Sequence, residues 1–183
     1  MLDLAELSRT FDDACGWITK ACGKRLTTEE KLRAALAMRK KMRWRPELND
    51  VLAAAGHGIH SVLEYRYLRD VERAHGLPRS RHQVRVVIDG KVVYRDAYYE
   101  EYELDGRLAH PEDERWRDSQ RDNQASARGV ETRRHSWRDV YAHSCETALL
   151  QAQILRGRGW PGTPKPCSAG CPVGATFSRR RGA

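Results

Sequence analysis

The sequence predicts an α/β fold of the α+β kind: a helical N-terminal part followed by a core with a small mixed sheet flanked by helices. Two observations lead to this prediction. Through the first part of the chain, apolar residues recur at spacings of three and four, as they do in amphipathic helices. Farther along, residues 83–88 and 91–96 have the composition of two strands, and Asp89-Gly90 between them favours a two-residue hairpin turn.

Four helices are expected before the hairpin. The first covers residues 3–22, where the apolar spacing is continuous. The capping-box pattern Thr27-Thr-Glu-Glu30 opens the second helix, and Pro46 suits the first turn of the third. Ser61-Val-Leu-Glu64 opens the fourth, which Gly76 stops.

Strands and helices alternate after the hairpin. We expect a turn and a short strand within 98–105, a charged helix at 111–127, a strand at 130–135 and a last helix at 140–155. From Gly157 onward, Gly, Pro, Cys and Arg dominate, which indicates an irregular segment.

This order of elements divides the chain into three parts. They are a helical N-terminal region at 1–58, a core at 59–156 and an irregular tail at 157–183. A chain of 183 residues is long enough for one domain of ordinary size plus an appendage.

The composition favours a cytoplasmic protein that meets a polyanion. No apolar run approaches the roughly 18 residues of a membrane span, and the first residues lack the pattern of a signal peptide. Five cysteines, an odd number, are expected to be reduced thiols. The net charge is +8, but residues 97–131 form an acidic block inside the basic chain. Carboxylates that hold a metal, surrounded by a basic surface that attracts phosphate, would have this pattern.

Four carboxylates carry the candidate chemistry: Glu64 early in a helix, Asp96 at the end of the hairpin, and Glu103 with Asp105 on the next strand. Residues two apart on a strand face the same side, so Glu103 and Asp105 would project together. Oxygen ligands of this kind suit Mg²⁺, which polarises a phosphodiester. Each residue also has a plainer interpretation, such as a helix cap for Glu64 or a surface ion pair for Asp96.

Several motifs occur between Ser61 and the last predicted helix: Ser61-x-x-Glu64-x-Arg66, Tyr94-Arg-Asp96, Tyr99-Glu-Glu-Tyr102, Glu103-Leu-Asp-Gly106, His110, Arg115-Trp-Arg-Asp118, Arg121-Asp-Asn123 and Trp137-x-Asp-Val140. With these motifs the stretch from Ser61 to Asp139 resembles proteins related to very-short-patch-repair endonucleases, within the PD-(D/E)XK nuclease superfamily. The tail motif Pro166-Cys-x-x-x-Cys171-Pro resembles one subgroup of that family. The N-terminal helices resemble the region that follows a winged helix in longer relatives linked to abortive-infection type IV antitoxins.

The resemblance implies a restriction-endonuclease-like core in which Asp96 and Glu103 bind Mg²⁺. Asp105 would stand where many superfamily members carry a lysine, and it would join the metal ligands. Glu64 would assist from its helix. His110 would be a general acid or a phosphate contact, with a plain loop residue as the alternative.

Two departures from the family leave two functions open. Glu103 follows Tyr102 directly, where relatives carry a short apolar run, and Arg133 stands on a late strand where an apolar residue is expected. The first function is a Mg²⁺-dependent DNA endonuclease of repair or phage defence. The second is an inactive nuclease-fold module that binds DNA or a toxin-type protein partner. Nothing in the sequence sets the oligomeric state.

A second metal site was weighed at His143, Cys145, Cys167 and Cys171, whose side chains are zinc ligands by type. The Cys-x-x-x-Cys spacing is looser than that of a zinc knuckle, and Cys145 falls in a predicted helix. We therefore expect a buried Cys145 and two unligated thiols, Cys167 and Cys171, rather than Zn²⁺.

Overall fold

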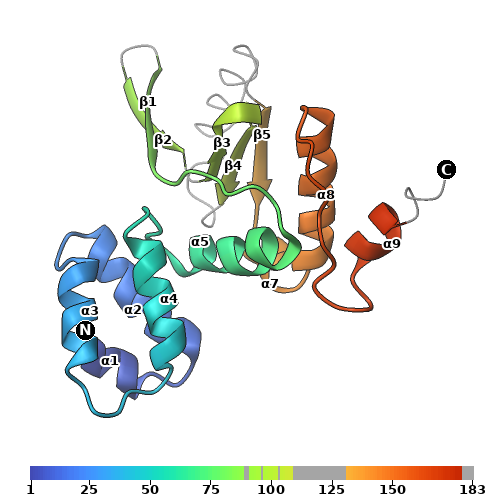
Figure 1. Cartoon of the computed structure of the whole chain (residues 1–183). Helices are drawn as coiled ribbons and strands as arrows, with labels where there is room; N and C mark the ends of the chain where they lie inside the picture. Colours follow the sequence, from blue (N-terminus) through green and yellow to red (C-terminus); the bar gives the residue numbers. More distant parts are fainter. Residues whose placement is uncertain (89–90, 96, 103, 109–130, 179–183) are drawn as a thin grey trace. The chain divides into compact units, whose positions relative to one another are not determined.

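The computed structural model describes residues 1–88, 91–95, 97–102, 104–108 and 131–178 (Figure 1). The chain forms two compact units, Met1–Tyr65 and Arg66–Ala183. The first is helical, and the second combines helices with a hairpin and a mixed sheet, which confirms the predicted α+β fold. No helix within the described ranges is long and apolar enough to cross a membrane.

The helices of the first unit follow the predicted pattern with one correction. They are α1 (Leu2–Leu7), α2 (Phe11–Gly23), α3 (Glu29–Ala37), α4 (Arg45–Ala55) and α5 (Val62–Arg66), the last of which ends one residue into the second unit. The single helix expected over 3–22 is two helices, because Thr10 starts a new one. Its hydroxyl accepts from Asp13 N at 3.1 Å, and the Asp13 carboxylate accepts from Thr10 N at 3.3 Å.

The core of the first unit is built from the apolar faces of these helices. Ile18 of α2 is fully buried, as are Leu48 and Leu52 of α4. Tyr65 closes this core: its ring meets Phe11 edge to face at 6.0 Å, and its hydroxyl donates to Asp50 at 3.0 Å.

The second unit opens with the predicted hairpin. Strands β1 (Val84–Ile88) and β2 (Lys91–Arg95) pair antiparallel, from Val84 opposite Arg95 to Ile88 opposite Lys91. This register leaves two residues for the turn, as Asp89-Gly90 predicts, although residues 89–90 lie outside the described ranges.

A three-stranded mixed sheet follows, in the order β3-β4-β5. The region 98–105 contains the expected turn and short strand, preceded by a second strand: β3 (Ala97–Tyr99), the 3₁₀ turn η2 (Glu100–Tyr102) and β4 (Leu104–Leu108). Strand β3 pairs antiparallel with β4, and β4 pairs parallel with β5 (Glu131–His135). The helix predicted at 111–127 lies outside the described residues.

Arg133, which stands where relatives of the family would carry an apolar residue, lies on β5. Among the described strands, β4 is the central one and β5 lies at the end of the order. Arg133 is exposed, so its charge is not buried in the core, whereas His135 on the same strand is buried. The sheet therefore accommodates the arginine without loss of the core.

The second unit also contains helices from sequence-distant parts of the chain. They are the π-helical η1 (Tyr67–Arg73), α7 (Trp137–Tyr141), α8 (Ser144–Gly157) and α9 (Pro172–Ser178). Leu155 of α8 packs with Tyr99 and Leu104 of the sheet, and Figure 1 shows α8 alongside β5. The helix predicted over 140–155 is therefore interrupted, with a short α7 before a separate α8.

The C-terminal segment is not irregular as predicted, because it contains α9. Val173 in the first turn of this helix is fully buried, and Cys171 just before it is 4% exposed. Helix α9 packs on α8. Burial of these two side chains orders a stretch whose composition alone indicated no structure.

The Thr10 cap gives a direct test of the break between α1 and α2. Thr10→Ala removes the acceptor for Asp13 N, so we expect the free energy of unfolding to fall by about 1 kcal/mol in urea denaturation. Replacement of the exposed neighbour in Arg9→Ala is the control. If residues 2–23 formed one continuous helix, Thr10→Ala would stabilise the protein instead, because alanine has the higher helix propensity.

Candidate functional site

The predicted Mg²⁺ ligands are described only in part. Asp105 lies on β4, where its backbone pairs with that of Tyr98 on β3. Asp96, Glu103 and His110 lie outside the described residues. The assignment of Asp96, Glu103 and Asp105 as Mg²⁺ ligands, and of His110 as a general acid or phosphate contact, therefore stays a prediction.

Glu64 has the contacts of a helix cap. Its carboxylate accepts from His60 N at 2.8 Å and from Ser61 Oγ at 3.0 Å, and Glu64 N donates back to Ser61 Oγ at 3.2 Å. These contacts agree with the plainer interpretation of Ser61-x-x-Glu64 as a helix cap, with the N–H of His60 in place of the Ser61 N–H of a standard capping box. The side chain is buried at the start of α5, and its capping contacts suffice to explain why it is there.

A buried carboxylate that sequence analysis did not select lies in the second unit. Glu72 of η1 accepts a hydrogen bond from Tyr99 Oη at 2.7 Å and from Ser80 N at 3.3 Å. Tyr67 Oη is 3.0 Å from Tyr99 Oη, and the Tyr67 ring stacks on His135 with centroids 5.2 Å apart. This network ties η1 to β3 and β5.

The π-helical turn explains how one helix presents both Tyr67 and Glu72 to the sheet. Hydrogen bonds in such a helix join residues five apart, so these two positions fall on the same side. The available sequence signal was Glu72 four residues after Leu68, which puts an acid on the apolar stripe of the helix.

Burial dominates the electrostatics of this network. It raises the pKa of Glu72 to about 7, although the hydrogen bonds from Ser80 and Tyr99 act in the opposite direction. Burial likewise raises the pKa of Tyr67 and of Tyr99, and it lowers the pKa of His135. The Glu72 carboxylate can therefore bind a proton near neutral pH. Because Glu72 and Tyr99 are almost inaccessible to solvent, we interpret the network as structural.

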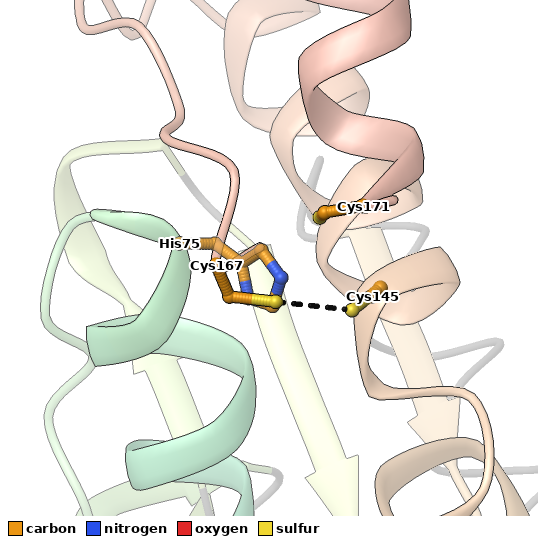
Figure 2. A group of neighbouring side chains, drawn as sticks. All are labelled: His75, Cys145, Cys167 and Cys171. Atoms are coloured by element: carbon orange, nitrogen blue, oxygen red, sulfur yellow. Dashed lines mark hydrogen bonds between the residues drawn. The ribbon is translucent and has the colours of Figure 1, made fainter. Parts of the chain in front are cut away.

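A second cluster brings together four side chains of metal-ligand type: His75, Cys145, Cys167 and Cys171 (Figure 2). One ligand atom from each lies within 4.8 Å of the others, and the sulfur atoms of Cys145 and Cys167 are 3.4 Å apart. The three cysteines are those that the sequence singled out. The histidine differs from the candidate considered in the sequence: His143 is the residue before α8, whereas His75 lies in the cluster.

Three separate parts of the chain supply this His/Cys₃ cluster. His75 lies just after η1 and is fully buried, and Cys145 is in the first turn of α8. Cys167 and Cys171 come from the segment before α9, which Figure 2 shows passing between the two helices. Gly76 has φ +63°, a conformation that glycine adopts without strain and that turns the chain away directly after His75.

Comparisons of the chain with protein-family models, with curated proteins and with solved structures found no match. The resemblance to nucleases therefore rests on the motifs of the sequence. The function has to be argued from the sheet, the charges and the side-chain clusters of this chain.

Glu72 should make stability depend on pH. Its ordinary pKa is 4.5 and its folded-state pKa is about 7, so between these values the folded state holds a proton that the unfolded state releases. The free energy of unfolding should therefore fall as pH rises through this range. Glu72→Gln should remove the fall and, above pH 7, stabilise the protein by up to about 3 kcal/mol.

Urea denaturation between pH 4.5 and 8 measures this effect, with the exposed Glu47 changed in Glu47→Gln as the matched control. The control should keep the pH dependence of the parent. A Glu72→Gln variant that loses stability equally at all pH values would show that Glu72 is ionised in the folded state.

Proposed function

We propose that the chain is a Mg²⁺-dependent endonuclease-like protein that hydrolyses DNA phosphodiesters in repair or phage defence. The observation that carries the proposal is the register of the mixed sheet. Asp105 pairs with Tyr98 across β3 and β4, and β5 returns parallel to β4. This arrangement agrees with the core that the sequence resemblance implies.

The charges next to this part of the sheet support a phosphate-bearing substrate. Residues directly opposite each other in an antiparallel pair share a face, so the Asp105 position lies on the same face as Tyr98. The Arg95 guanidinium lies over the Tyr98 ring, 4.3 Å from its centroid. Carboxylate metal ligands repel the negatively charged phosphate backbone of DNA. A cation such as Arg95 on the neighbouring strand would offset part of that repulsion.

The donor set fits Mg²⁺ by its chemistry. Asp96, Glu103 and Asp105 would hold the ion, since Mg²⁺ prefers a few carboxylates together with water and phosphate oxygens. When bound, the ion would polarise the phosphodiester and lower the pKa of a bound water. The rest of the chain, with its net charge of +8, would draw the DNA backbone toward the site.

A second candidate function is a nuclease-fold module that binds DNA or a toxin-type partner without cutting. The shortness of β3 favours it: the strand spans Ala97–Tyr99, and η2 begins at the next residue. So few paired residues provide little support for a precisely placed pair of metal ligands. The capping contacts of Glu64 point the same way, because they already account for that carboxylate.

Cleavage of supercoiled plasmid in Mg²⁺ separates the two functions. Asp96→Asn and Asp105→Asn should each lower the cleavage rate by about 100-fold or more, the size typical of losing a group that stabilises a transition state. Glu101→Gln, which changes an exposed carboxylate of η2, should cut like the parent. An Asp105→Asn variant that cuts as fast as the parent would refute the assignment of the site.

DNA binding provides the second measurement. The affinity of the parent and of Asp105→Asn should fall linearly with salt concentration on logarithmic axes, because bound phosphates release counterions. Salt-dependent binding without cleavage by the parent would establish the non-catalytic module. Absence of both binding and cleavage would contradict the endonuclease and the DNA-binding module, and would leave only the module that binds a toxin-type partner.

A further inference from the structure

We propose that His75, Cys145, Cys167 and Cys171 bind one Zn²⁺ ion in a closed, structural site. This inference is independent of the nuclease proposal, since it uses none of the predicted Mg²⁺ ligands. It also replaces the expectation that Cys167 and Cys171 are unligated thiols.

The distances are close to those of a tetrahedral zinc site. With zinc–sulfur bonds of about 2.3 Å, the sulfur atoms of such a site lie about 3.8 Å apart. All four ligand atoms here fall within 4.8 Å of one another, and Cys145 Sγ is 3.4 Å from Cys167 Sγ. Shifts of about 1 Å or less would bring the four atoms to ideal positions around one ion.

His75 is prepared as a ligand by its backbone contact. Its Nδ1 lies 3.0 Å from Val71 O, which accepts the ring proton and leaves the lone pair on Nε2. Nε2 is buried and has no hydrogen-bond partner among the described residues. A buried polar atom without a partner costs free energy, and a metal ion at the centre of the cluster would remove that cost.

The three thiols suit a divalent cation between them. Three neighbouring thiolates would repel one another, and a bound divalent cation stabilises all of them.

The chemical type of the ligands indicates which metal ion binds, and their number indicates whether the site is structural or catalytic. Thiolates and an imidazole suit Zn²⁺, whereas Mg²⁺ takes oxygen ligands. Four protein ligands complete the tetrahedron, which is the arrangement of structural zinc sites, while catalytic sites keep a position for water. The ion would therefore hold the fold together and take no part in hydrolysis.

The position of the cluster shows what the ion would join. Lys165 N donates to His75 O at 2.7 Å, so the C-terminal segment already meets the end of η1 there. Cys145 adds α8, and Cys171 leads directly into α9. Zinc would fix these sequence-distant segments to one point. The free energy of metal binding would offset the entropy lost when the chain between the ligands closes into loops.

A disulfide between Cys145 and Cys167 is the competing explanation for the short sulfur–sulfur distance. It would leave Cys171 and the buried Nε2 of His75 without a role. The two explanations differ in mass and in metal content, which makes them separable in the unmodified protein.

The first experiment therefore uses the full chain, purified from zinc-supplemented cells. Elemental analysis should find one zinc per chain, and a mercurial that modifies thiols should release it to a colorimetric chelator. Replacement of the zinc by Co²⁺ should give the intense visible absorption of a tetrahedral thiolate complex. Absence of zinc and of a cobalt spectrum, or an intact mass two hydrogens lower that identifies the disulfide, would overturn the proposal.

Paired substitutions then test the ligands one by one. His75→Ala and Cys171→Ser should lose the bound zinc, whereas His143→Ala and Cys22→Ser, outside the cluster, should keep it. His75→Cys should retain zinc with a redder cobalt spectrum, which distinguishes ligation from mere folding. Retention of zinc by His75→Ala together with its loss from His143→Ala would refute this ligand set.

Discussion

The second unit depends on the contact at the end of η1 where the fully buried His75 meets the C-terminal segment. The chain turns away there through Gly76, and Lys165 N bonds to the carbonyl of His75. The zinc ion proposed for the His/Cys₃ cluster would hold α8 and the start of α9 at the same point. It would add one fixed point to helices whose apolar side chains, such as Leu155 and Val173, are already buried.

Apolar periodicity and turn residues in the sequence predicted those elements whose structure depends on neighbouring residues. The helices of the first unit and the β1-β2 hairpin follow from periodicity and turn residues, and they are present as expected. The errors arose where a few contacts override a long pattern. Thr10 and Asp13 cap a new helix inside a continuous apolar stripe, and burial of Val173 orders a segment of irregular composition.

The candidate sites could be predicted less well than the fold, because they are formed by residues far apart in the sequence. The three cysteines could be chosen by type, but His75 could not be distinguished from His143, because only the folded chain brings the end of η1 to the cysteines. Glu72 was missed for a related reason: its burial depends on Tyr99, a residue of the sheet. The carboxylates were chosen from their spacing and from the motif resemblance, and of these Glu64 has the contacts of a helix cap.

The coordination of the metal is the central claim about this fold, and X-ray absorption at the zinc edge of the purified chain tests it most directly. The account predicts three sulfur ligands at about 2.3 Å and one nitrogen at about 2.0–2.1 Å. A first shell of oxygen atoms, or of fewer sulfur atoms with water in the fourth position, would contradict a closed His/Cys₃ site.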